Sequence, residues 1–315
     1  MGILRKMYNQ SIVRYDELPY LKYLTPNDCP GLKYEPYSFM SEENKLNGFF
    51  YHYDKYKEDI IVVFSHGIGG GHLSYMKEID RIAQRGYMVL GYDNTGCCTS
   101  EGKSIKALTH SLTDLDYAIR SLKENPRYKD KKIYVVGHSW GGYAASNIYN
   151  YHDVDKIVAV SPFISARQEF KGILHNPLLF FLANPLVKLE REANNDYADS
   201  NAIDALNKVN AVGLVIHSTN DPTVDYKLNT GLLQKKCTNK NISFVTFDNK
   251  YHHPQYTEEA VLYFNKTFDG FTKLLKQKKL QTLDEKKEYF KDVDWNKIIE
   301  PDESFWEIVY EFLDK

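Results

Sequence analysis

The sequence predicts an α/β fold in which helices cover a mostly parallel sheet. Two observations predict it: short β-branched runs alternate with longer amphipathic segments, and the short runs are apolar at nearly every position. Strands buried on both faces read in this way, which is typical of a parallel sheet. With 315 residues, of which 43% are hydrophobic, the chain is long enough to form a large core.

Eight segments are expected to be strands. The first two, 32–40 and 48–53, look like an antiparallel pair added at one edge of the sheet. The others are 60–65, 87–92, 132–137, 156–160, 211–218 and 242–247. Helices are expected at 74–85, 111–125, 140–151 and 257–279, and the last of these ends in lysines that suit the negative end of a helix dipole.

The alternation of strands and helices is interrupted once. Residues 162–205 crowd aromatic and aliphatic side chains together with three prolines, after which the pattern resumes. We therefore expect residues 1–161 and 206–279 to form an α/β core and residues 162–205 to be an insertion. Residues 280–315 end in an apolar helical stripe, which predicts a C-terminal helical extension packed on the core.

The charge, the cysteines and the apolar stretches narrow the class of protein. A formal net charge of −2 gives no overall attraction to nucleic acid, so we expect no nucleic-acid partner. Four cysteines are too few for a disulfide framework in a chain of this size. The N-terminus does not read as a signal peptide, and the most apolar stretch, 177–189, falls short of the roughly 20 residues that span a bilayer. We expect a cytoplasmic protein without stable membrane insertion. The sequence gives no indication of the oligomeric state.

Residues 137–141, Gly-His-Ser-Trp-Gly, carry the strongest chemical signal. This G-x-S-x-G pattern comes directly after an expected strand and directly before a helix of small residues. A sharp strand-to-helix turn holds its serine in a strained conformation with the hydroxyl exposed, and the glycines leave the room that the turn needs. We therefore predict that Ser139 is a nucleophile; the alternative is a turn whose serine only caps a helix.

A serine nucleophile needs a base to take its proton and an acid to orient that base. Asp221 lies just past the strand 211–218 and is the candidate acid. Asp225 is a rival, although it directly precedes a helical segment and is better suited to cap it.

Two adjacent histidines, His252 and His253, are candidates for the base. Both follow the strand 242–247 within a loop from which a side chain could reach the serine. His217 lies on a strand and is expected to pack in the core, whereas His138 is expected to face sideways from the turn. The residues alone leave the choice between the first two open.

The glycine-rich segment 66–71, His-Gly-Ile-Gly-Gly-Gly, is the candidate oxyanion loop. Such a loop lets backbone N–H groups approach a reacting carbonyl, and we expect the donors to be Ile68 and Trp140. Nucleotide binding is the alternative, but a dinucleotide fingerprint would need glycine where His72 stands, and a P-loop would need glycine at Cys97. We expect no cofactor and no metal, because backbone donors can meet the charge that develops on oxygen.

In this order, the glycine loop, the serine turn, the acid and the histidine resemble those of the α/β-hydrolases, in the branch of serine aminopeptidase-like hydrolases, monoacylglycerol lipases and small esterases. The resemblance covers residues 33–279. Relatives often carry D-x-x-G-x-G-x-S after the next strand, and residues 93–100 keep three of these four positions, with Cys98 replacing the second glycine. Some relatives carry His-Asn-Pro-Asn-Tyr-Thr, a frame that residues 252–257 fit with His252 in the catalytic position. The resemblance therefore favours His252 as the base.

The resemblance further implies that residues 162–205 form a cap over the active site. Four phenylalanines of this segment could line a pocket for an acyl or aromatic group, namely Phe163, Phe170, Phe180 and Phe181. Alternatively, they only pack the cap onto the sheet. The function that the resemblance implies is a serine hydrolase that cleaves a small-molecule ester or thioester through an acyl-enzyme on Ser139.

Two other functions stay open. An aminopeptidase-like enzyme would cleave amides and would recognise a substrate ammonium through acidic cap residues. Five are available: Glu169, Glu190, Glu192, Asp196 and Asp199. Because they stand beside lysines and an arginine, a solvated surface of mixed charge is the simpler interpretation. A non-catalytic module that binds an apolar ligand is the remaining possibility, against which the complete set of triad residues argues.

Overall fold

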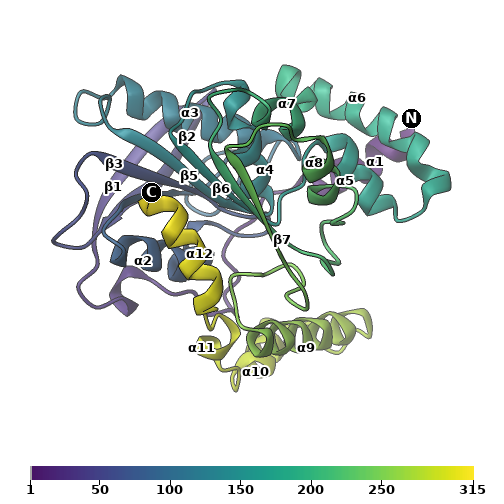
Figure 1. The fold of residues 1–315 in the computed structure, drawn as a ribbon. Coiled ribbons are helices and arrows are strands. Elements are labelled where there is room, and N and C mark those ends of the chain that lie inside the picture. Colours follow the sequence, from purple (N-terminus) through teal and green to yellow (C-terminus); the bar gives the residue numbers. More distant parts are fainter. Residues whose placement is uncertain (1) are drawn as a thin grey trace.

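The computed structural model describes residues 2–315, and its strands make up one sheet (Figure 1). The strands are β1 Lys33–Ser41, β2 Asn44–His52, β3 Ile60–Ser65, β4 Met88–Tyr92, β5 Lys132–His138, β6 Lys156–Val160, β7 Gly213–Ser218 and β8 Ile242–Phe247. Their order in the sheet is β1-β2-β4-β3-β5-β6-β7-β8. β2 is antiparallel to β1 and to β4, whereas all other neighbours are parallel. The expected mostly parallel sheet, with an antiparallel pair at one edge, is confirmed.

β2 begins at Asn44, earlier than the expected residue 48. The chain reverses at Glu42, whose φ is 51°, and Ser41 then pairs directly with Asn44. Asn44 and Leu46 are buried while Lys45 between them is exposed, so the start of the strand alternates between buried and exposed residues, although the buried Asn44 is polar. This alternation is the pattern of a strand with one solvated face, and the interrupted apolar run conceals it in the sequence.

The helices follow the strands in alternation. They are α1 Gly2–Ser11, α2 Met76–Gln84, α3 His110–Glu124, α4 Trp140–Asn147, α5 Ala166–Leu174, α6 Ala183–Asn194, α7 Ala202–Leu206, α8 Thr230–Lys236, α9 Glu258–Lys276, α10 Leu283–Phe290, α11 Trp295–Ile298 and α12 Glu303–Asp314. Within residues 2–315, none of these helices has the length and apolar character needed to cross a membrane.

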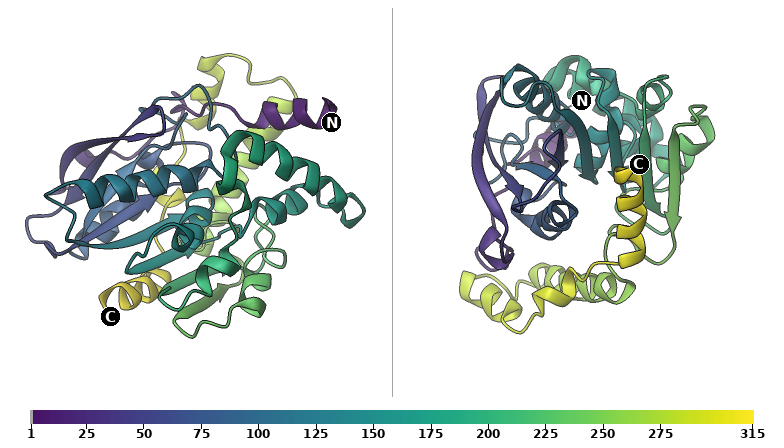
Figure 2. Two further views of the ribbon diagram at one scale, coloured as in Figure 1. Left: turned by 90° about the horizontal axis from the view of Figure 1, so that it is seen from above. Right: turned by 60° about the vertical axis from the view of Figure 1, so that its left-hand side comes forward.

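Helices cover the sheet on both faces. Ile61 and Val63 of β3 belong to a core cluster that includes apolar residues of α3 and α4, whereas Val62 and Phe64 belong to a second cluster with α2 and α12. Successive side chains of a strand point to opposite faces, so a strand that is apolar throughout supplies both cores. The result is the three-layered arrangement seen in Figures 1 and 2.

Residues 162–205 form three of the helices, α5 to α7, between β6 and β7. The N-terminal helix α1 packs on this segment, where Tyr8 is buried with Phe170 and Val187. The Tyr8 hydroxyl also donates a hydrogen bond of 2.6 Å to Glu190. The middle of α6 is therefore linked to α1 by apolar contacts and by a buried polar contact.

The last helix, α12, lies along the sheet, apart from the group formed by α9 to α11 (Figures 1 and 2). Phe305, Trp306 and Val309 are buried in the same core cluster as α2. At the end of the helix, the Asp314 carboxylate accepts hydrogen bonds from Lys57, Arg85 and Tyr87. Residues 303–314 thus close one face of the core.

We expect the variant Phe305→Ala to lower the free energy of unfolding by about 3–5 kcal/mol, because it removes a large side chain that is only 2% exposed and leaves a cavity. The matched control is Phe181→Ala, the same change at a side chain that is 65% exposed, for which about 0.5 kcal/mol or less is expected. Denaturant titration measures both, and equal losses would contradict the assignment of α12 to the core.

Candidate active site

Ser139 lies on a strained turn between β5 and α4. Its φ is 56° and its ψ is −113°, a backbone conformation that few residues other than glycine adopt. The turn is held by two backbone hydrogen bonds of 2.8 Å, one from Ser139 N–H to the Val160 carbonyl and one from Tyr143 N–H to the Ser139 carbonyl. Strain that the surroundings maintain at one serine is characteristic of a functional turn.

The glycines around Ser139 are required by close contacts between backbones. A Cβ atom at Gly141 would overlap the carbonyl of Ser65 at the end of β3, and one at Gly137 would overlap the carbonyl of Gly141. At Gly142, a Cβ atom would lie 2.7 Å from the carbonyl of Val160 at the end of β6. The turn therefore packs directly against the strands on both sides of β5.

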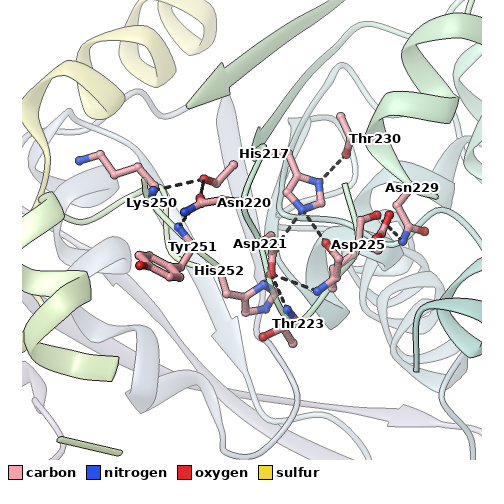
Figure 3. Close-up of polar contacts among 12 residues, drawn as sticks. His217, Asn220, Asp221, Thr223, Asp225, Asn229, Thr230, Lys250, Tyr251 and His252 are labelled. Atoms are coloured by element: carbon pink, nitrogen blue, oxygen red, sulfur yellow. Dashed lines mark hydrogen bonds and ion pairs between the residues drawn. The ribbon is translucent and has the colours of Figure 1, made fainter. Parts of the chain in front are cut away.

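Asp221 and His252 are paired by a hydrogen bond of 2.7 Å from Nδ1 of the imidazole to Oδ2 of the carboxylate (Figure 3). The Asp221 side chain is fully buried, whereas 13% of the His252 side chain is exposed. Because Nδ1 carries the proton in this pair, the other ring nitrogen, Nε2, is left with a free lone pair. The pair has the arrangement of an acid that orients a base.

Asp221 has three further donors in addition to His252. Oδ1 accepts the backbone N–H groups of Thr223, at 2.8 Å, and Val224, at 3.0 Å, and Oδ2 accepts Nε2–H of His217 at 3.0 Å. Burial by itself raises the pKa of Asp221, but the charges and hydrogen bonds of His252 and His217 outweigh burial and hold the pKa well below its usual range. The carboxylate is therefore ionised throughout the neutral pH range.

His217 is the residue whose part in the site was missed from the sequence. Its position on β7 indicates core packing, and its side chain is indeed fully buried. In addition, the Thr230 hydroxyl lies 2.7 Å from Nδ1, which directs Nε2–H towards Asp221 (Figure 3). The spacing of four residues between His217 and Asp221 is the only trace of this contact in the sequence.

Asp225 and His253 occupy other environments. Oδ1 of Asp225 accepts the backbone N–H of Leu228 at 2.7 Å, as a capping residue does. The ring of His253 stacks on His138, with 5.1 Å between centroids, and lies 4.9 Å from the ring of Phe264. Burial, followed by the charge of His252, lowers the pKa of His253 to about 3. The structure thus brings His252, and not its neighbour, to the carboxylate.

His138 connects the serine turn to the loop of His252. Its Nε2 lies 2.8 Å from the backbone carbonyl of His252, which can only accept, so this nitrogen carries the proton. Nδ1 then accepts the hydroxyl of Tyr75 at 2.9 Å. Burial, together with the neighbouring imidazoles, keeps the pKa of His138 well below its usual value, so the ring is neutral.

Ser139 and His252 are not joined by a hydrogen bond in residues 2–315; His138, next to the serine, supplies the contact between the two segments. Such a gap is common before substrate binds, because catalytic hydrogen bonds often tighten only in the complex.

Asp93 anchors the candidate oxyanion loop at its far end. The carboxylate accepts the backbone N–H of His72 at 2.8 Å and Nδ1–H of the same residue at 2.7 Å. Ile68, in the middle of the loop, is 41% exposed, and Trp140 is the first residue of α4. The first N–H groups of a helix have no partner within the helix, so the Trp140 N–H is available to a ligand.

In the loop 93–100, the cysteine at the expected glycine position adopts a backbone conformation that favours glycine. Cys98 has φ of 41°, within the left-handed region in which glycine is favoured. The Arg14 guanidinium donates to the carbonyls of Ser100 and Gly102 and holds the loop from outside.

The four phenylalanines expected to bind substrate lie in different surroundings. Phe163 stacks on Tyr143, with 4.4 Å between ring centroids, and is 3% exposed. Phe170 packs against Tyr8 in the cluster with α1. Lys171 lies over the ring of Phe180, and Phe181 points outwards. A role for any of the four in substrate binding stays a prediction.

Most of the acidic residues considered for ammonium recognition have partners within the chain. Glu190 accepts hydrogen bonds from α1 and from the start of α3, Glu192 pairs with Arg5, and Asp199 pairs with Arg191. Asp196 is exposed. Glu169 is buried like Glu190, but its Oε2 lacks the hydrogen-bond partners that Glu190 has within residues 2–315.

The Glu169 side chain is buried, and its Oε2 has no hydrogen-bond partner within residues 2–315. Burial raises its pKa to about 8, and the nearby charges of Asp221 and Asp225 add to the shift. Glu169, on α5, is therefore largely protonated at neutral pH and lies near Asp221 and Asp225.

Comparison with known proteins identifies the fold. Residues 56–201 match the family model described as serine aminopeptidase, S33. An esterase of Pyrococcus furiosus superposes with a TM-score of 0.60 at 19% identity, over 84% of this chain and 99% of that chain. An acylaminoacyl peptidase of Pyrococcus horikoshii superposes with a TM-score of 0.54 at 15% identity, over 72% of this chain and 39% of that one. No curated protein matches the chain. The protein has the α/β-hydrolase fold, as the resemblance implied.

The two adjacent histidines can be separated by mutation. We expect His252→Ala to lower kcat/KM for an activated ester at least about 10³-fold, because it removes the group that Asp221 orients. His253→Phe, which keeps a ring between His138 and Phe264, is the matched control and is expected to stay within about tenfold of the unmodified protein. The reverse ranking of the two variants would show that His253 is the base.

Proposed function

We propose that the protein is a serine hydrolase that cleaves a carboxylic ester or thioester through an acyl-enzyme on Ser139. One observation carries the proposal: the 2.7 Å pair of Asp221 and His252 lies beside a serine held in the strained turn between β5 and α4. A buried carboxylate, an oriented imidazole and a strained serine are the parts that activate a hydroxyl for attack on a carbonyl.

The first half of the reaction forms the acyl-enzyme. Oγ of Ser139 attacks the carbonyl carbon while Nε2 of His252 takes the hydroxyl proton, and the carbonyl oxygen becomes an oxyanion. The oxyanion then collapses, the bond to the leaving oxygen or sulfur breaks, and His252 returns the proton to that atom. Asp221 stays ionised throughout and stabilises the imidazolium between the two transfers.

The second half repeats these steps with water in place of the serine. His252 takes a proton from water, the hydroxide attacks the acyl carbon, and Ser139 leaves with the proton that His252 returns. In both halves the backbone N–H groups of Ile68 and Trp140 stabilise the oxyanion, and one such donor is typically worth about 3 kcal/mol. None of these steps needs a metal or an organic cofactor.

The test compares two serines at the ends of neighbouring strands. Ser139→Ala should lower the hydrolysis of p-nitrophenyl esters, from acetate to palmitate, by about 10⁴-fold or more while leaving the fold intact. Ser161→Ala is the matched control, because Ser161 is also buried, follows β6 and has a φ of 47°. It should retain activity.

A fluorophosphonate probe should label the unmodified protein and not the Ser139→Ala variant. Appreciable hydrolysis by that variant would refute the nucleophile, and a folded protein that is neither active nor labelled would favour the module that binds an apolar ligand.

Amide cleavage is a second candidate, favoured by the single observation that Glu169 is buried without a partner near Asp221. If the site takes an aminoacyl substrate, Glu169 would lose its proton on binding, and the resulting carboxylate would pair with the substrate ammonium. Glu169→Gln should then raise KM for aminoacyl p-nitroanilides about tenfold and leave that for neutral esters unchanged. The control Glu192→Gln alters an exposed residue paired with Arg5 and should change neither the KM for aminoacyl p-nitroanilides nor the KM for neutral esters. No hydrolysis of aminoacyl anilides by the unmodified protein would reject the candidate.

A further inference from the structure

A cavity of about 340 Å³ opens beside the candidate oxyanion loop, and none of its lining residues belongs to residues 162–205. Four segments form its walls: residues 18–24, the turn from Gly69 into α2, the middle of α9, and α11. Its volume lies within the range of small-molecule sites. In Figures 1 and 2, the group of α9 to α11 lies on the other side of the end of β7 from α5 to α7.

The lining of the cavity is mainly apolar. Its aliphatic residues are Leu18, Leu21, Leu24, Leu73, Met76, Ile298 and Ile299, and its aromatic residues are Tyr23, Phe264, Phe268 and Trp295. Phe264 and Phe268 are in contact, with 4.5 Å between ring centroids and their planes tilted by 37°, and make one wall, while Met76 is almost fully buried. Such a surface binds hydrocarbon and offers few polar partners.

Two residues of the cavity wall lie close to proposed catalytic groups, although these groups do not themselves line the cavity. Gly69, in its wall, directly follows Ile68, the expected oxyanion donor. Phe264, in the wall formed by α9, has its ring centroid 4.9 Å from that of His253, which directly follows His252. A substrate whose carbonyl reaches the oxyanion loop therefore has an apolar cavity next to it.

The charged residues of the lining are Lys22 and Lys77, and no carboxylate lines the cavity. A substrate ammonium placed here would meet cations. An uncharged acyl chain, by contrast, would bury its methylene groups against the aliphatic and aromatic walls, which is worth about fourfold in affinity for each methylene.

We propose that this cavity binds the acyl chain of the substrate, so that the enzyme prefers esters of medium or long unbranched acids over acetate. The proposal rests on the proposed function, because it assigns the acyl side of the same reaction. It also separates the substrate pocket from residues 162–205, whose phenylalanines at 163 and 170 are already packed within the protein.

Selectivity between a long and a short ester tests whether the acyl chain binds in this cavity. Leu18→Trp should lower the ratio of kcat/KM for p-nitrophenyl dodecanoate over acetate about tenfold or more, because the larger side chain fills part of the cavity. Leu179→Trp is the matched control: Leu179 is 37% exposed and Leu18 is 38% exposed, but Leu179 belongs to residues 162–205. The control should leave the ratio unchanged. An unchanged ratio in the first variant, or a lowered ratio in the control, would overturn the proposal.

A binding measurement tests the cavity without catalysis. Trp295 lies in the lining, whereas Trp140 and Trp306 are buried elsewhere. In the Ser139→Ala variant, 12-bromododecanoate should quench tryptophan fluorescence on binding, and the additional change Trp295→Phe should abolish most of the quenching. Absence of quenching, or equal quenching without Trp295, would refute the cavity as an acyl site.

The two measurements also separate this inference from the proposed function. Quenching through Trp295 in a protein that hydrolyses no ester would mean that the cavity binds an acyl chain but that the hydrolase proposal is wrong. Serine-dependent hydrolysis with no preference for longer chains and no quenching would mean that the hydrolase proposal is right but that this cavity does not bind the acyl chain.

Discussion

The close packing of backbone around Ser139 is the constraint on which the rest of the site depends. The turn at residues 137–142 lies so near the ends of β3 and β6 that side chains at three of its positions would collide with main-chain carbonyls. The serine is thereby fixed relative to both neighbouring strands, and the loops that leave those strands begin within reach of it. Because the strands are parallel, the segments after β3, β5, β7 and β8 all start at the same edge of the sheet, where a ligand is bound in open α/β sheets. The geometry of the site is therefore a property of the sheet and not of any single loop.

A continuous chain of polar contacts then orders the groups at that edge. It runs from Tyr75 through His138 to the carbonyl of His252, from the ring of His252 to Asp221, and on through His217 to Thr230. Each donor in the chain meets an acceptor, so the tautomers of His138, His252 and His217 follow from their partners. Low local dielectric strengthens such a network when all its members are satisfied and makes it costly to interrupt. The pairing of one carboxylate with two imidazoles also explains why Asp221 stays ionised although it is buried.

The sheet could be predicted from the sequence because strands such as β3 and β5 are apolar on both faces, a pattern that few other structures produce. Ser139, Asp221 and the two histidines could be proposed because each follows a recognisable strand, and Asp221 and His252 do lie together. The residues alone left the choice between His252 and His253 open, because it depends on the path of a loop that has no periodicity; the resemblance favoured His252, which is the one paired with Asp221. The contact between His217 and Asp221 depends on how the chain turns after β7. The cavity is formed by residues 18–24 together with α9 and α11, which are far apart in the sequence, so no local pattern reveals it. Local sequence signals thus predicted the strands, the helices and the candidate catalytic residues, whereas contacts between distant segments could be identified only in the structure.

The burial of α12 bears on how the protein is made. Residues 303–314 cover the face of the sheet formed by alternate residues of β3 and β5, yet the ribosome synthesises all eight strands before this helix. Until the helix emerges, Val62, Phe64 and their neighbours lack part of the apolar cover that they have in the final structure. Exposed apolar surface on an incomplete domain favours aggregation and binding by chaperones. The growing chain therefore passes through a stage in which its strands exist but one face of the sheet is open, and that face is covered only after α12 has emerged.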